Sequence, residues 1–266
     1  MADHTEHQAS GLAADPPLPL IELKMLTKRY GALVAVDQVY MQVAEGEVRA
    51  VIGPNGAGKT TLFHLVTSIV RPTAGSVRFA GEDITGLPAH EICQRGLSRT
   101  FQLTSLFPEM SARENTMLAA QARHPGRSLP FGGSAVFKHA RQAGDAALEQ
   151  LGLGHVADRP AGLLSHGDQR LLEVAMAMAQ SPKVLLLDEP TQGLSVEETA
   201  EAVATLARFL EQSRMTVMLV EHDMEVVFRL AHRITVLHRG AVIADDVPDA
   251  VRADPRVQEA YLGGMD

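Results

Sequence analysis

One glycine-rich stretch, Gly-Pro-Asn-Gly-Ala-Gly-Lys-Thr-Thr at residues 53–61, restricts the possible folds of this chain more than any other feature. It fits the phosphate-binding pattern G-x-x-x-x-G-K-S/T. The apolar, β-branched run 48–52 before it predicts a buried strand, and the run 61–66 after it predicts a helix. A loop between such a strand and helix aims backbone N–H groups and a helix N-terminus at a polyphosphate. The alternative, a glycine-rich turn that binds nothing, is disfavoured because both flanks fit.

The pattern gives individual residues of the loop chemical roles. Lys59 would pair with β- and γ-phosphate oxygens, and the hydroxyl of Thr60 would be a ligand of Mg²⁺. The glycines would let the backbone approach the phosphates without a clashing Cβ. The predicted cofactor-binding residues of the loop are Gly53, Asn55, Gly56, Gly58, Lys59, Thr60 and Thr61.

Composition excludes several classes of protein. A net charge of −8 argues against a nucleic-acid surface, which needs clustered Lys and Arg. No apolar run approaches the roughly 18 residues of a membrane span, and the acidic N-terminus has no apolar signal region. Cys93 is the one cysteine, so we expect neither an internal disulfide nor a cysteine-based metal cluster. These features predict a cytosolic chain that meets a membrane only through a partner.

The hydrophobic pattern predicts an α/β fold. Apolar strands at 184–187, 216–220 and 234–237 are separated by helical patterns, which indicates a parallel sheet. Period-2 runs at 20–26 and 34–41 predict an antiparallel edge, with a turn at 28–31 between them. The predicted organisation is a disordered tail (1–19) and one domain (20–266), the latter made of a nucleotide-binding core (20–87 and 165–247), a helical subdomain (88–164, with a loop at 125–133) and a C-terminal helical tail (248–266).

Two carboxylates follow one of the predicted buried strands. Asp188 and Glu189 come directly after Val-Leu-Leu-Leu, so they should lie at the carboxyl edge of the sheet, where ligands bind in open α/β folds. Asp188 would hold magnesium through water, and Glu189 would orient or deprotonate the attacking water. Without the phosphate loop, two solvated acids at a strand end would be the better interpretation.

Five further residues acquire a role only beside the phosphate loop. His222 also follows a strand and could contact the γ-phosphate or hold the attacking water, although a lone histidine there is more often a cap. Gln102 could reach magnesium and the water, but alone it carries no signal. Ser165 is a good N-cap, and its helix N-terminus, with Gly167, would form a second anion site or merely a capped helix. Tyr30 could stack on adenine or fill a turn.

These motifs, in this order, resemble those of the ATP-binding-cassette (ABC) ATPases over about residues 20–262. Residues 53–61 are similar to Walker A, Gln102 to the Q-loop, 164–168 to the LSGGQ signature, 184–189 to Walker B, 193–195 to the D-loop and 221–223 to the switch histidine. The resemblance implies a P-loop NTPase (RecA-like) fold with a mixed sheet, an antiparallel β edge and an inserted helical subdomain. It also implies the cofactors ATP and Mg²⁺.

In that family two cassettes pair head to tail, with each ATP between one chain's Walker A and the other chain's signature helix. The resemblance therefore implies a second ABC ATPase subunit, identical or different. Three residues depart from the family pattern: His166 stands for Gly, Asp168 for Gln, and Ser195 for Asp. A nucleotide-binding regulator with weak turnover stays open as an alternative on these grounds.

Within the family, the chain is most similar to the ATPase subunits of branched-chain amino-acid importers, on the segments 98–102, 106–111, 167–170, 221–224 and 260–263. Importers of urea and short amides share much of this. The implied partners are integral membrane permease subunits and, indirectly, a periplasmic solute-binding protein, with the chain at the cytoplasmic face of the inner membrane. An ABC protein that acts on DNA or ribosomes should show two cassettes, a long coiled-coil insertion or a basic face. This alternative is disfavoured because the sequence shows none of them. A P-loop kinase or GTPase is disfavoured because no acceptor site or Asn-Lys-x-Asp motif is found.

Overall fold

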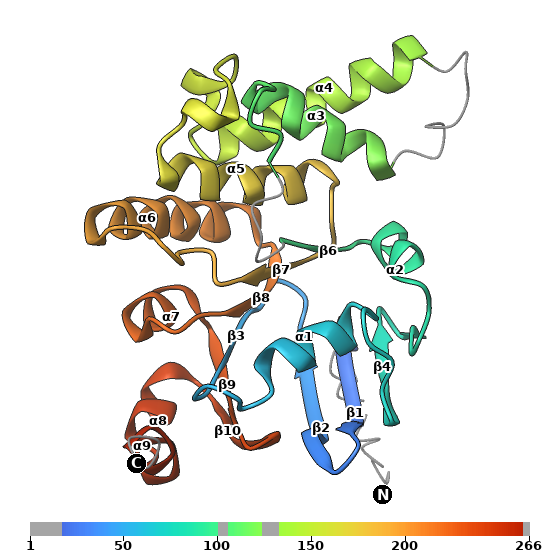
Figure 1. Cartoon of the computed structure of the whole chain (residues 1–266), viewed down its shortest axis with the longest axis vertical. Coiled ribbons are helices and arrows are strands. Elements are labelled where there is room, and N and C mark those ends of the chain that lie inside the picture. The colour runs from blue at the N-terminus through green and yellow to red at the C-terminus, as the bar shows by residue number, and fades with distance from the viewer. Residues whose placement is uncertain (1–17, 101–105, 124–132, 263–266) are drawn as a thin grey trace, which may run out of the picture.

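The computed structural model describes residues 18–100, 106–123 and 133–262 and contains two sheets (Figure 1). Three predicted features therefore lie outside the described residues: the tail except for its last two residues, Gln102, and most of the loop at 125–133. The strands are β1 (Ile21–Tyr30), β2 (Leu33–Val43), β3 (Val48–Ile52), β4 (Ala74–Phe79), β5 (Glu82–Asp83), β6 (Leu97–Arg99), β7 (Val184–Asp188), β8 (Thr216–Val220), β9 (Arg233–His238) and β10 (Ala241–Asp246). The α-helices are α1 (Lys59–Val66), α2 (Ala89–Arg95), α3 (Ala112–Arg123), α4 (Gly133–Gln150), α5 (His166–Ala179), α6 (Val196–Ser213), α7 (Met224–Leu230), α8 (Pro248–Ala253) and α9 (Pro255–Leu262).

The larger sheet has the strand order β10-β9-β3-β8-β7-β6 and is parallel except for β10, which pairs antiparallel with β9. Every residue of β3, β7 and β8 is buried, as expected for parallel strands that are covered on both faces. Because β8 lies between β3 and β7, the carboxyl ends of these three strands meet at one edge. The predicted α/β fold with a mixed sheet is confirmed.

The smaller sheet, β2-β1-β4-β5, is antiparallel. Helix α1 packs beneath it, so that Leu62 and Phe63 share one apolar core with Leu23 of β1 and Leu186 of β7. The predicted turn at 28–31 is wrong in its extent. Strand β1 continues to Tyr30, which pairs with Leu33 of β2, because the chain reverses over only two residues at Gly31.

Helices α3, α4 and α5 stand together at the end of the molecule opposite to α8 and α9 (Figure 1). Helix α5 begins directly after Ser165, as predicted, and its apolar face, including Leu172 and Val174, joins the core that covers the other face of the larger sheet. The helical part is thus continuous with the sheet core through α5. How the chain divides into subdomains stays a prediction.

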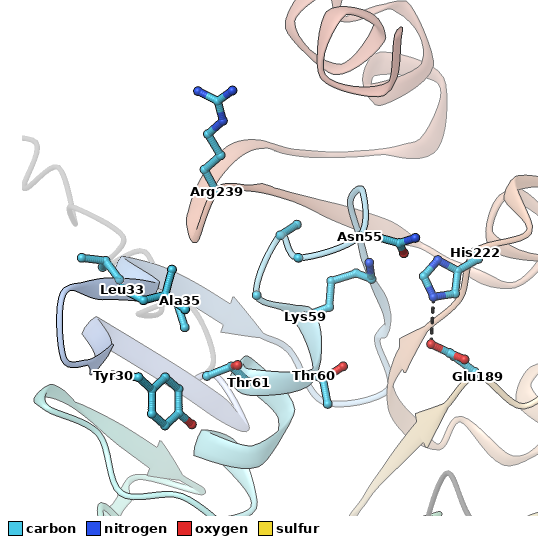
Figure 2. Close-up of a pocket in the computed structure, with 14 residues that line it drawn as sticks. Tyr30, Leu33, Ala35, Asn55, Lys59, Thr60, Thr61, Glu189, His222 and Arg239 are labelled. Carbon is cyan, nitrogen blue, oxygen red and sulfur yellow. Dashed lines mark hydrogen bonds and ion pairs between the residues drawn. The ribbon is translucent and has the colours of Figure 1, made fainter. Parts of the chain in front are cut away.

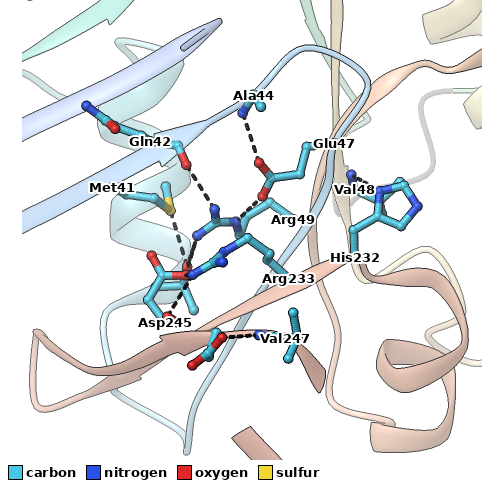
Figure 3. Close-up of polar contacts among 12 residues, drawn as sticks. Met41, Gln42, Ala44, Glu47, Val48, Arg49, His232, Arg233, Asp245 and Val247 are labelled. Atoms are coloured by element: carbon cyan, nitrogen blue, oxygen red, sulfur yellow. Dashed lines mark hydrogen bonds and ion pairs between the residues drawn. The ribbon is translucent and has the colours of Figure 1, made fainter. Parts of the chain in front are cut away.

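A buried arginine joins the two sheets (Figure 3). Arg49 of β3 is 2% exposed and donates to the carbonyl of Gln42 in β2, at 2.9 Å. It also donates to Glu47 at 2.6 Å, to Thr235 of β9 at 3.0 Å and to Asp245 of β10 at 2.6 Å. A guanidinium with this many partners is satisfied despite its burial. The sequence analysis did not single out this network.

Among the described residues, no helix has the length and apolar character needed to cross a membrane.

Candidate active site

A cavity of about 520 Å³ opens where the edge of the larger sheet faces the smaller sheet (Figure 2). It brings together residues from β1, β2, the glycine loop, α1 and the ends of β7 and β8. Of the predicted site residues, those that line it are Tyr30, Asn55, Gly56, Gly58, Lys59, Thr60, Thr61, Glu189 and His222. Leu33, Val34, Ala35 and Arg239 also line the cavity and were not predicted.

The glycine loop needs glycine where it touches other backbone. A Cβ on Gly58 would lie 2.3 Å from the carbonyl oxygen of Ala35, and one on Gly53 would lie 2.1 Å from that of Leu237. Both residues also have positive φ, of 105° and 150°. These contacts fix the loop between strands β2 and β9, and Gly58 then caps the start of α1. A side chain at either position would therefore displace the loop from these strands.

The Lys59 ammonium donates to the carbonyls of Gly53, at 2.6 Å, and Pro54, at 3.1 Å. Burial lowers the pKa of Lys59, and the carboxylate of Glu189 opposes that shift. The ammonium is therefore a desolvated charge inside the loop, positioned to exchange a carbonyl for a phosphate oxygen.

Glu189 and His222 form a hydrogen-bonded pair at the sheet edge (Figure 2). His222 Nε2 lies 2.8 Å from Glu189 Oε1, and Glu189 is 7% exposed.

Glu221, which was predicted only as part of a motif, supports the segments that carry this pair. Its carboxylate accepts hydrogen bonds from the backbone N–H and the hydroxyl of Thr191, at 2.9 and 2.7 Å, and so ties the end of β8 to the segment after β7. Glu189 itself has a φ of 52°, a left-handed conformation that a side chain of this kind adopts only under constraint.

Asp188 lies beside the cavity and not in its lining. Its side chain is fully covered, and Oδ2 accepts a hydrogen bond of 2.5 Å from Arg99 at the end of β6. Burial and the charge of Arg99 lower the pKa of the neighbouring His64, and the charge of Asp188 opposes that shift. Oδ1 of Asp188 is buried without a hydrogen-bond partner among the described residues.

The described residues fit a magnesium ion of the kind that phosphates help to hold. Mg²⁺ in nucleotide sites takes one or two protein oxygens, several waters and phosphate oxygens. Thr60 lines the cavity, and Asp188, which directly precedes the lining residue Glu189, has a carboxylate oxygen without a hydrogen-bond partner among the described residues. Gln102, the third predicted ligand, lies outside the described residues.

Ser165 and Gly167 lie at the start of α5 and do not line this cavity. The hydroxyl of Ser165 accepts a hydrogen bond of 3.1 Å from the backbone N–H of Asp168, which confirms the predicted N-cap. The side chain of Glu198 packs against Gly167, since a Cβ there would be 3.7 Å from that of Glu198. Ser195, which departs from the family pattern, caps α6 in a capping box with Glu198. The two helix starts thus lie side by side, joined through Glu198.

The comparisons with known proteins decide the family. A family profile described as ABC transporter matches residues 36–192, more than half of the chain. The chain belongs to the ABC transporter family of ATP-binding cassettes. A second profile, described as branched-chain amino acid ATP-binding cassette transporter, matches residues 241–266. The cassette is thus a nucleotide-binding protein and an ATPase.

Relatives and solved structures agree with this assignment over nearly the whole chain. The cassette is 43% identical to the high-affinity branched-chain amino acid transport ATP-binding protein BraF of Pseudomonas aeruginosa, covering 92% of this chain and 98% of that one. It is 36% identical to the lipopolysaccharide export system ATP-binding protein LptB of Acidithiobacillus ferridurans, covering 92% and 97%. It superposes on the ADP conformation of the ATP-binding cassette MJ1267 with a TM-score of 0.79, at 28% identity and coverage of 92% and 99%. The dimeric structure of the cassette MJ0796 bound to ADP and Pi gives 0.70, at 27% identity and coverage of 86% and 98%.

Tyr30 provides a first test of how the cavity takes a nucleotide. Tyr30 lines the cavity and is 47% exposed, and the ammonium of Lys28 lies 4.9 Å from the centroid of its ring. Stacking of a base on an aromatic ring contributes about 1–3 kcal/mol. We therefore expect Tyr30→Ala to weaken ATP binding by roughly 5- to 100-fold, while Tyr30→Phe, which keeps the ring, binds within about twofold of the unmodified chain. Equilibrium binding of ATP measured by calorimetry checks this, and equal affinities for all three chains would rule out stacking on Tyr30.

Proposed function

We propose that the cassette is the ATP-hydrolysing subunit of an importer of branched-chain amino acids. The match of residues 241–266 to the branched-chain amino acid profile carries the choice of substrate, because this segment lies apart from the motifs common to cassettes of all kinds. The name of the relative BraF supports the same choice. An importer of urea, of short amides or of another small organic solute is the second candidate. The Ser-His-Gly sequence at 165–167 favours it, because it resembles the signature of the importers of urea and short amides.

The geometry of the cavity supports a division of labour among its residues. Lys59 and the N–H groups of the glycine loop would bind the phosphates, and Tyr30 would hold the adenine. Thr60, Asp188 and Gln102 would hold magnesium, which supplies charge neutralisation at the β- and γ-phosphate oxygens. Glu189, held by His222, would take the proton of the attacking water. His222 would fix that carboxylate and reach the γ-phosphate.

The second half of the site would come from another cassette, identical or different. In a head-to-tail pair, Ser165 and Gly167 of one chain would face the triphosphate bound by the glycine loop of the other. This arrangement accounts for the observation that Ser165 and Gly167, at the start of α5, do not line the cavity of their own chain. A dimer bound to ADP and Pi among the solved relatives supports it. Integral permease subunits would hold the pair at the cytoplasmic face of the inner membrane and would receive the solute from a periplasmic binding protein.

Uptake by intact cells tests the proposed substrate. Deleting the gene for this cassette should abolish uptake of radiolabelled leucine, isoleucine and valine at low external concentration, and uptake of labelled urea should continue. Re-expression of the cassette should restore the amino-acid uptake, whereas re-expression with Glu189→Gln should not. Loss of urea or amide uptake with intact amino-acid uptake would favour the second candidate. Restoration by the Glu189→Gln chain would contradict the role of an ATP-hydrolysing motor.

A further inference from the structure

The carboxylate predicted to serve magnesium is occupied by an arginine of the same chain. The side chain of Asp188 is 0% exposed and that of Arg99 is 6% exposed, so water reaches neither group freely. Among the described residues, Arg99 alone forms an ion pair with Asp188. The Arg99 guanidinium also lies 6.0 Å from the ring centroid of Phe63 on α1. Arg99 therefore lies beside α1, the helix that begins at Lys59.

This buried pair is incompletely bonded. Only Nη2 of Arg99 and Oδ2 of Asp188 meet, whereas Nε and Nη1 of Arg99 and Oδ1 of Asp188 have no hydrogen-bond partner among the described residues. Buried arginine–carboxylate pairs that serve stability are usually bidentate and have their remaining donors satisfied. Arg49, whose side chain is 3% exposed, shows such saturation in this same chain. The open valences at Arg99 and Asp188 indicate a contact that is exchanged during function.

Mg²⁺ and the Arg99 guanidinium cannot both bind the Asp188 carboxylate without weakening each other's contact. A magnesium ion held by Asp188 would stand close to the guanidinium, because Oδ2 of that carboxylate accepts a hydrogen bond of 2.5 Å from Arg99. Like charges repel strongly at such distances in a site with low exposure. Coordination of the metal therefore has to loosen the contact between Arg99 and Asp188.

We propose that Arg99 is an exchangeable counter-ion, which neutralises Asp188 while the site holds no metal and releases the carboxylate when magnesium enters with the nucleotide. The inference rests on the proposed function, in which a magnesium–nucleotide complex is the ligand of the cavity. Because the guanidinium has to give way, the charge of Arg99 lowers the apparent magnesium affinity of the site. Arg99 acts through Asp188 and does not touch the nucleotide.

Magnesium-dependent nucleotide binding tests this proposal without measuring turnover. A fluorescent ATP analogue labelled on the ribose is bound to the full chain in EDTA and then titrated with Mg²⁺. In Arg99→Gln, where the neutral amide can still donate to Asp188 Oδ2, we expect the half-saturating Mg²⁺ concentration to fall at least tenfold. The affinity in EDTA should stay within about twofold, since the nucleotide contacts are unchanged. An unchanged or higher Mg²⁺ requirement would overturn the proposal and would make Arg99 a group that merely orients Asp188.

Four further chains make the result independent of folding defects. Arg99→Met is a second neutral side chain and should show the same shift, whereas Arg99→Lys keeps the charge and should stay within threefold of the unmodified chain. In an Asp188→Asn background, the difference between arginine and glutamine at position 99 should disappear, because the shared carboxylate is gone. A shift that persists in that background would place the effect elsewhere and overturn the proposal. An unmodified chain whose nucleotide affinity did not respond to Mg²⁺ would overturn the proposed function as well.

Discussion

Glu189→Gln is expected to lower ATP turnover by about 10²- to 10⁴-fold, the contribution typical of a positioned general base. The glutamine side chain has the same shape and can still pair with His222 Nε2, which lies 2.8 Å from the carboxylate, but it cannot accept the proton of water. Binding of ATP should stay within about threefold, because in the proposed arrangement the phosphates contact the glycine loop and not residue 189. Phosphate release at saturating Mg²⁺ and ATP measures the first effect, and calorimetry measures the second.

Glu211→Gln is the matched control for that substitution. Glu211 is an exposed glutamate near the end of α6, away from the cavity, so its variant should turn over at the unmodified rate. Turnover by Glu189→Gln at a rate similar to this control would remove Glu189 from the catalytic role. A turnover rate of the unmodified chain and of this control that is itself close to background would instead favour the regulator with weak turnover.

Arg49→Ala is expected to destabilise the fold by about 3–5 kcal/mol, the cost of leaving buried charges without their partner. The substitution takes the closest cation away from Glu47, whose side chain is 11% exposed, and from Asp245, at 29%, which keeps only Arg233 at 3.5 Å. It also removes the donor to the Gln42 carbonyl, and with it the link between β3 and β2 of the smaller sheet. Urea unfolding followed by circular dichroism should show a lower midpoint with a similar slope.

Arg256→Ala is the control for an ion pair on the surface. Arg256 donates to Asp254 at 2.6 Å, but its side chain is 69% exposed, and such pairs contribute at most about 1 kcal/mol. Midpoints that coincide for the two variants would show that the Arg49 network contributes no more than a surface contact, which would contradict the role assigned to it.

Much of the cavity could be predicted from the sequence because its residues belong to local patterns. Four features come at the end of an apolar strand: the glycine loop, Asp188, Glu189 and His222. Parallel pairing of β3, β8 and β7 then brings the three strand ends to one edge, as their alternation with helices predicted. The N-cap at Ser165 was equally local, since a serine before an amphipathic run identifies it.

What could not be predicted depends on contacts between distant segments. The pair Arg99–Asp188 joins residues 89 positions apart, and only the adjacency of β6 and β7 brings them together. Strand β10 was missed because its hairpin turn has Arg239 and Gly240 at positive φ, of 50° and 85°. Such two-residue turns are recognised by Asn-Gly or Asp-Gly, and Arg-Gly gives no comparable signal. The bridging role of Glu221 likewise depends on Thr191, which precedes it by 30 positions.

The central claim is that a triphosphate is bound between the glycine loop of one cassette and the α5 N-terminus of its partner. A cryo-EM structure of the assembled transporter with Glu189→Gln and bound ATP tests this most directly. We predict the Ser165 hydroxyl and the Gly167 N–H at hydrogen-bonding distance, about 3 Å, from γ-phosphate oxygens held by the other cassette. Nucleotide held by the glycine loop alone, with the α5 N-terminus turned away from both cavities, would contradict the account.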